Sequence, residues 1–181
     1  MRLRCLLLAW GLMSATAVLA QWHSLVDESE LTFIVSFEGL EIAGRFAGFQ
    51  VYTNFDPNDP STAQLEVQVD LRSADMNDAE VNQEIAGPVW FDVPGQPQAS
   101  FRSQHIFTLA DGFVAHGTLE LKGVRRPVQV PFSWVGDDSR SVMTGELAID
   151  RRHFEIGIGE WADDEVIGYP VTVKFRVTLV P

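Results

Sequence analysis

The chain is almost without cysteine. Its single cysteine, Cys5, lies within the first 20 of the 181 residues. Residues 21–181 therefore have no thiol with which to form a disulfide, a thiolate nucleophile or a cysteine–metal site. A domain of this length without disulfides depends on an ordinary hydrophobic core for its stability.

The first 20 residues differ in character from the rest. Arg2 and Arg4 precede an almost wholly apolar run from Cys5 to Leu12, and a small residue, Ala20, comes directly before Gln21. This pattern is typical of a cleavable secretory signal, and the apolar run is too short to span a membrane. We expect residues 1–20 to be removed on export and residues 21–181 to form one domain. No second long apolar run follows, so no membrane-spanning segment is expected.

Positive charge is also scarce. The chain has 13 lysines and arginines against 25 aspartates and glutamates, a net charge of −12. Removing Arg2 and Arg4 leaves 11 basic and 25 acidic side chains, or about −14. Such a surface repels phosphate backbones and anionic lipid head groups. Nucleic acid is therefore excluded as a partner.

The signatures of catalytic and metal sites are missing as well. The four histidines (His23, His105, His116 and His153) show no spacing that would place two ligands on one face. There is no Gly-x-Ser-x-Gly motif and no glycine-rich phosphate loop. We expect no catalytic residue, no metal and no cofactor. Strict alternation places His105 on an inward face, where a histidine more often satisfies a local hydrogen bond than performs chemistry.

What the sequence does have is alternation of apolar and polar residues. Segments with this pattern are 31–37, 49–55, 65–71, 99–107, 115–121, 128–134, 145–149 and 171–179. A period of two residues is typical of strands with one buried face. Turn signals separate the segments, so we predict an all-β domain of about eight antiparallel strands. The pattern alone is compatible with a sandwich or with a closed barrel.

One segment, residues 73–87, breaks this alternation. Met76, Val81 and Ile85 stand near helical spacing, and Gly87 and Pro88 follow as stop signals. Ser73 or Asp75 is a candidate N-cap. We predict a short helix over 74–86, inserted as a lid over one end of the sheet, with Val81 and Ile85 on its apolar side.

The apolar faces of the strands mix large residues with small ones. The small residues are Ala99, Ser103, Ala115, Gly117 and Gly145. They could make room for the aromatic side chains opposite, which would give a solid interior, or they could leave an apolar channel. An eight-stranded barrel is just wide enough for either arrangement. The residue pattern leaves both open.

Four stretches carry motifs that bear on this choice. They are LVDESELTFIVSFEGLEIAGRFAGFQVYTNFDP (25–57), WFDVPGQPQASFRS (90–103), GTLELKGVRRPV (117–128) and RRHFEIG (151–157). In this order they resemble the YceI-like family of polyisoprenoid-binding, lipocalin-like proteins. Trp90 replaces the usual phenylalanine, residues 37–39 read FEG where members often carry HLG, and residues 81–85 read VNQEI in place of an Arg-Asp-x-His-Leu run.

The resemblance implies an eight-stranded antiparallel lipocalin-like β-barrel with a helix at its mouth and a long-chain isoprenoid inside. It also implies a periplasmic location, with secretion as the alternative, and makes a homodimer plausible. Val81 and Ile85 would belong to the lid. The side chains expected to line the interior are Phe33, Val35, Phe37, Phe49, Val51, Phe55, Leu65, Val67, Phe101, His105, Leu119, Phe132, Trp134, Leu147, Val173 and Phe175.

Three functions remain in competition. The first, which we favour, is an exported carrier or sequestering protein for a polyprenyl or quinone-like lipid, without enzymatic activity. The second is a stress-related interaction module with a solid barrel whose acidic surface binds a basic partner. The third is a hydrolase or isomerase that acts on a bound lipid through His105 or a nearby carboxylate inside the barrel. The volume of the interior distinguishes the first from the second.

Overall fold

The computed structural model describes residues 21–181, so the expected signal sequence lies outside the described residues. The strands are β1 (Trp22–Ser24), β2 (Glu30–Phe37), β3 (Leu40–Phe46), β4 (Phe49–Thr53), β5 (Leu65–Asp70), β6 (Ala74–Asp75), β7 (Gln98–Leu109), β8 (Gly112–Leu121), β9 (Val124–Asp137), β10 (Arg140–Asp150) and β11 (Ile167–Val180). One α-helix, α1 (Ala79–Ile85), and five short 3₁₀ turns complete the described chain. The turns span Val26–Glu28, Pro60–Thr62, Leu71–Ser73, Arg151–Phe154 and Gly159–Trp161.

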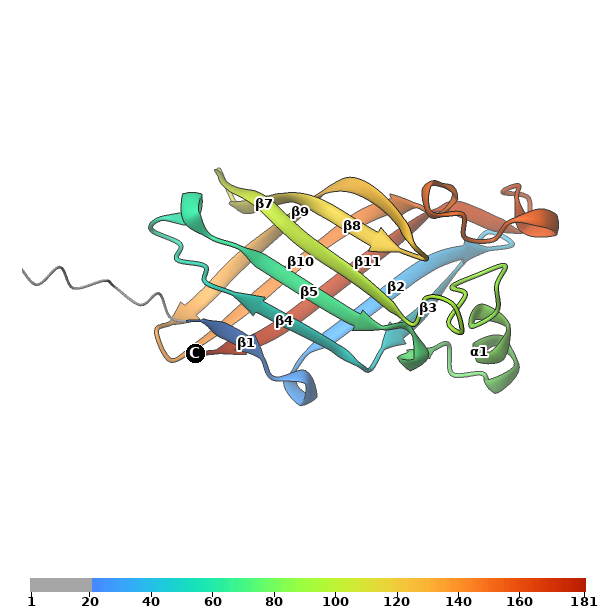
Figure 1. Ribbon diagram of the computed structural model, residues 1–181, viewed down its shortest axis with the longest axis horizontal. Coiled ribbons are helices and arrows are strands. Elements are labelled where there is room, and N and C mark those ends of the chain that lie inside the picture. Colours follow the sequence, from blue (N-terminus) through green and yellow to red (C-terminus); the bar gives the residue numbers. More distant parts are fainter. Residues whose placement is uncertain (1–20) are drawn as a thin grey trace, which may run out of the picture.

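The strands form one antiparallel sheet that closes on itself. The ring runs β1, β4, β5, β7, β8, β9, β10, β11 and returns to β1, which pairs with both β4 and β11. Only the C-terminal end of β11 pairs with β1. The earlier residues of β11 pair with β2, and β2 in turn pairs with β3. The result is an elongated eight-stranded barrel with α1 at one end and β1 at the other (Figure 1). The prediction of an eight-stranded antiparallel barrel is confirmed.

One inward placement predicted by alternation is wrong. The pairing of β7 with β8 shifts register between Ser103 and His105, which marks a β-bulge. The extra residue reverses the alternation, so that Ile106 instead of His105 is buried in the interior. His105 is exposed on the outer face, and Phe107 follows it outward with 48% of its surface exposed.

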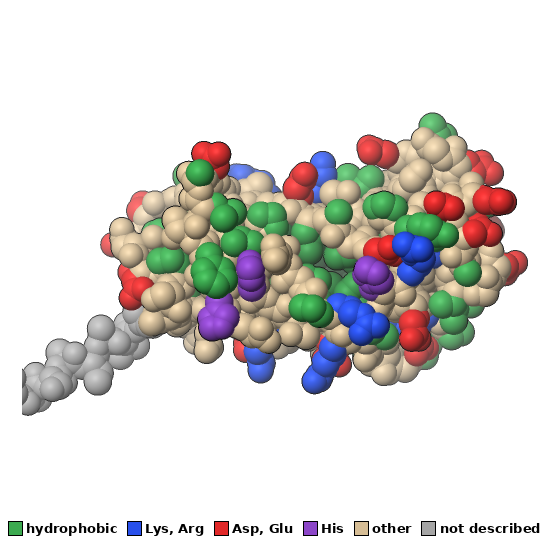
Figure 2. All heavy atoms as spheres, turned by 90° about the horizontal axis from the view of Figure 1, so that it is seen from above, with side chains coloured by type: hydrophobic (Ala, Val, Ile, Leu, Met, Phe, Trp, Pro, Cys, Tyr) green, Lys and Arg blue, Asp and Glu red, His purple; other side chains and the backbone are tan. Residues whose placement is uncertain are grey.

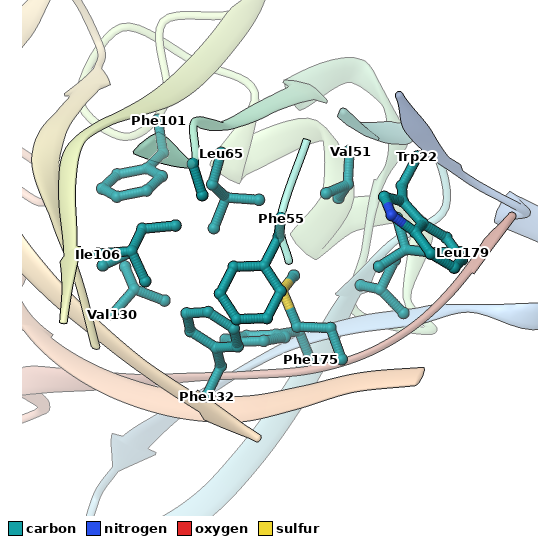
Figure 3. Packing of buried hydrophobic residues seen from close by; sticks show 14 of the residues in the cluster. Trp22, Val51, Phe55, Leu65, Phe101, Ile106, Val130, Phe132, Phe175 and Leu179 are labelled. Atoms are coloured by element: carbon teal, nitrogen blue, oxygen red, sulfur yellow. The ribbon is translucent and has the colours of Figure 1, made fainter. Parts of the chain in front are cut away.

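The end of the barrel near β1 is filled by aromatic side chains. We call these residues the plug: Trp22, Phe55, Phe113, Phe132 and Trp134. Their ring centroids lie 4.8 to 5.5 Å apart in successive pairs, mostly edge to face, an arrangement that aromatic rings prefer. Phe55 and Phe132 lie against each other within the buried cluster (Figure 3). This end of the interior is solid.

The opposite end is covered by two non-strand segments, residues 76–97 and 151–166, which we call the cap. The backbone N–H of Gly157 donates to the carbonyl of Val89 (2.9 Å), and the rings of Trp90 and Trp161 lie 5.8 Å apart. The Nζ of Lys122, in the β8–β9 turn, donates to the carbonyls of Val89 and of Glu155. These contacts join the two segments into one cover.

The helix of the cap is shorter than the sequence predicts. It begins after Asp78, whose carboxylate accepts the backbone N–H groups of Glu80 and Val81 at 2.9 and 3.0 Å. Ser73 and Asp75 are therefore not its N-cap. Residues 74–75 instead form β6 against β3, and Asn77 adopts a left-handed conformation (φ 58°) that separates β6 from the helix.

Candidate functional site: an apolar cavity inside the barrel

Between the plug and the cap, the barrel contains a cavity of about 510 Å³. This volume falls within the range of small-molecule pockets, roughly 300–1,000 Å³. Its wall is built by the inward faces of the strands and by the cap, and nearly all of it is aliphatic or aromatic. Only Glu84, Ser100 and Arg151 contribute a polar side chain. The interior is therefore hollow at this end, which contradicts the solid-barrel alternative.

Most residues predicted to line the interior lie at the wall of this cavity. They are Phe33, Val35, Phe37, Phe49, Val51, Leu65, Val67, Phe101, Leu119, Leu147, Val173 and Phe175, joined by Val81 and Ile85 of the expected lid. Phe55, Phe132 and Trp134 point inward but belong to the plug, so their placement at the cavity wall was wrong. His105 lies outside the barrel because of the bulge. An enzyme that uses His105 inside the barrel is therefore ruled out.

The sequence missed lining residues of two kinds. Some continue the alternation of predicted strands and could have been found, namely Leu31, Val69, Val130, Val171 and Val177. Others come from segments without periodicity, namely Trp90, Phe91, Arg151, Ile156 and Trp161. No local pattern marks the second group, because their position depends on how the cap folds over the barrel.

The small residues of the inner face make room for aromatic side chains, as the alternative of a filled interior expects, although a cavity remains. A Cβ added at Gly117 would lie 2.6 Å from ring atoms of Phe101, and one added at Gly145 would lie 2.5 Å from the ring of Phe175. Both glycines thus allow an aromatic ring to lie flat against the barrel wall. The cavity is what remains after these rings are accommodated.

Arg151 holds one half of the cap in place. Its side chain is 1% exposed, and its guanidinium donates all five of its N–H groups to backbone carbonyls. The acceptors are Gly168 (3.1 Å from Nε), Ile156 and Gly157 (3.0 and 2.8 Å from Nη1), and Asp163 and Ile167 (2.6 and 2.8 Å from Nη2). Burial lowers the pKa of Arg151 from its usual value. No donor is left over for a ligand, so Arg151 fixes the loop that forms the wall.

Glu84 is the one carboxylate at the cavity wall. It extends from α1, and its Oε1 accepts a hydrogen bond from the indole Nε1 of Trp90 at 3.2 Å. No residue of α1 is buried. Glu84 therefore stands where the apolar interior meets solvent.

Residues 21–181 give no support for a metal site or for a membrane-spanning helix. This part of the chain contains no group of three or more histidine, cysteine, aspartate or glutamate side chains arranged to hold a metal ion. Within the same range, no helix has the length and hydrophobicity needed to cross a membrane. The arrangement of the cavity suits the binding of an apolar molecule.

The closed antiparallel barrel and its apolar cavity define a ligand-binding β-barrel of the lipocalin-like class. The model of the YceI-like domain matches residues 22–179. The chain therefore belongs to the YceI-like family.

Curated relatives carry the family label UPF0312. A Yersinia pestis protein is 31% identical over 93 residues, which is 51% of this chain and 48% of that protein. A Serratia proteamaculans protein is 28% identical over 129 residues, covering 69% of this chain and 67% of its own length. The matched stretch thus spans about half the length of the Yersinia relative.

Solved structures share the fold. BcnA of Burkholderia cenocepacia superposes with a TM-score of 0.83 at 28% identity, covering 86% of this chain and 98% of that one. A polyisoprenoid-binding domain from Saccharophagus degradans gives a TM-score of 0.67 at 17% identity, covering 88% and 98%. The YCEI protein of Campylobacter jejuni gives 0.67 at 14% identity, covering 76% and 84%. The last two show the fold alone.

Proposed function

We propose that this protein is an exported, periplasmic lipid-binding protein that carries or sequesters a long-chain isoprenoid in the cavity of its barrel. The observation that carries the proposal is the cavity of about 510 Å³ inside the barrel, with its almost wholly apolar wall. Family membership and the polyisoprenoid-binding domain of the Saccharophagus protein support the choice of an isoprenoid over other apolar ligands. The predicted signal sequence over residues 1–20 supports export.

The energetics of such a site need no polar anchor. Each buried carbon of a lipid chain contributes about 0.8 kcal/mol, so a five-carbon isoprene unit contributes about 4 kcal/mol before the costs of ordering. Several units are enough for tight binding. This agrees with a wall that offers only three polar side chains.

The ligand enters at the cap and its tail points toward the plug. The plug is solid, with edge-to-face aromatic rings, whereas α1 has no buried residue and contributes Val81 and Ile85 to the cavity wall. Displacing α1 would therefore open the cavity at a lower cost than displacing the plug. The head group would then lie at the cap.

Native mass spectrometry of the mature protein, purified from an exporting host, tests the proposal. We expect a discrete added mass that organic extraction releases as an isoprenoid. A bulky variant, Val173→Trp, fills the cavity and should abolish the added mass. The matched control Val135→Trp places the same side chain on the outer face, where Val135 is 71% exposed, and should retain it. A bare mass that is unchanged after incubation with polyprenols would refute the proposal.

A further inference from the structure

The cap carries many carboxylates and few cations. Residues 76–97 and 151–166 contain nine of the 25 acidic side chains of the chain and only two basic ones, Arg151 and Arg152. Acidic side chains accordingly gather at the right-hand end of the molecule, which is the cap end (Figure 2). A head group held at the cap would lie in a negative electrostatic potential.

The cations of the cap and its surroundings are already occupied. Arg151 donates all its N–H groups to backbone carbonyls. The guanidinium of Arg152 pairs with Asp150 and lies 3.6 Å from the ring centre of Tyr169. Arg45 pairs with Asp75 at 2.9 Å.

The remaining cations provide no free positive charge at the cavity wall. Lys122 donates to two backbone carbonyls of the cap, one of them that of Glu155. Across residues 21–181, Arg126 and Arg176 form no ion pair, and neither lines the cavity. An anionic head group at the cavity wall would therefore meet no free cation among the lining residues.

Glu84 brings one negative charge to the wall itself. Its carboxylate is hydrogen-bonded to Trp90, which also lines the cavity. A phosphate or diphosphate at this place would be repelled by Glu84 and by the other carboxylates of the cap, whereas a hydroxyl, phenol or quinone carries no charge to be repelled.

Resting on the proposed function, we propose that the cavity selects isoprenoids with an uncharged head group and excludes phosphorylated ones, and that Glu84 is a determinant of this selectivity. The apolar wall supplies the affinity, and the charge of the cap sets which head groups are accepted. The cap thereby distinguishes lipids that have the same tail.

Two probes with one tail test this inference. Geranylgeraniol and geranylgeranyl diphosphate share their hydrocarbon chain and differ only in the head group. Binding to the mature protein, followed by tryptophan fluorescence at low ionic strength, should be at least tenfold weaker for the diphosphate. Added salt should narrow the difference, because it screens charges at the protein surface.

Variants at Glu84 separate its charge from its hydrogen bond. Glu84→Gln retains an acceptor for Trp90 and should raise the ratio of diphosphate affinity to geranylgeraniol affinity severalfold, and Glu84→Lys should raise this ratio further. The matched control Glu146→Gln removes a carboxylate that pairs with Lys174 on β10 and β11, outside the cap, and should leave the ratio as it is.

The outcomes are distinct. Equal or tighter binding of the diphosphate at low salt would overturn the selectivity and leave the proposed function standing. Loss of selectivity in Glu146→Gln as large as in Glu84→Gln would show that net charge, and not the position of Glu84, is responsible, and would overturn its role. Failure of both probes to bind would overturn the proposed function and this inference with it.

Discussion

Replacing Arg151 with lysine should destabilise the protein substantially although the charge is retained. An ammonium has three donors against the five that the guanidinium uses, so at least two backbone carbonyls lose their partner. The bonds from Nη1 to Ile156 and Gly157 are fully buried, and water cannot easily replace them there. Leaving a buried acceptor unsatisfied costs about 1–3 kcal/mol. We therefore expect a loss of about 2–6 kcal/mol in the free energy of unfolding.

Urea denaturation followed by tryptophan fluorescence measures this loss. Arg152→Lys is the matched control: Arg152 is half exposed and pairs with Asp150 at the surface, where an ion pair is worth about 0–1 kcal/mol. Hydrogen exchange should also quicken across residues 155–168, because the five carbonyls that Arg151 holds lie in this stretch. If Arg151→Lys cost no more than Arg152→Lys, the five hydrogen bonds would not be what holds the cap.

Three further perturbations follow from the same structure. Phe132→Ala removes a buried ring of the plug and should cost about 3–5 kcal/mol in urea denaturation, whereas Phe107→Ala, on the outer face, should cost far less; similar losses would contradict a solid plug. His105→Ala should leave the affinity for geranylgeraniol unchanged in the fluorescence assay, since the bulge places it outside; a loss of binding would contradict that placement. Hydrogen bonds from Arg152 lower the pKa of Asp150 from 3.8 to about 2. Its stabilising contribution is therefore complete above about pH 4 and is lost as the pH falls through 2, so Asp150→Asn should flatten the acid limb of a stability–pH profile, and an unchanged limb would refute this.

The strands could be predicted because their signal is local, whereas their closure into a barrel was implied only by the family resemblance. Alternation over residues 65–71 or 171–179 reports directly which side chains face inward, and the order of the motifs identified the family. The bulge in β7 could not be predicted in this way. A single extra residue reverses every later inward assignment on the strand, which is why His105 was misplaced while Phe101 was not.

The cavity wall was harder to predict than the strands that build it. Alternation says that Phe55, Phe132 and Trp134 point inward, but it does not say how far along the barrel axis they lie. Their depth depends on which strands are neighbours and in what register. Trp90 and Trp161 lie in segments without any period, and their place at the wall follows from long-range contacts of the cap, including those made by Arg151.

The plug end of the barrel contributes stability, and the cap end contains the binding cavity. At the plug, aromatic rings fill the interior and join strands that are not neighbours in the sheet, since Trp22 of β1 contacts Trp134 of β9. That packing does not depend on a ligand. It allows the other end to remain hollow, with a cap whose helix has no buried residue and whose loop is held by hydrogen bonds from Arg151 and Lys122. Protein regions that must open to admit a ligand are drawn from the least stable parts of a fold. A barrel packed equally at both ends would be more stable, but it would leave no room for an isoprenoid.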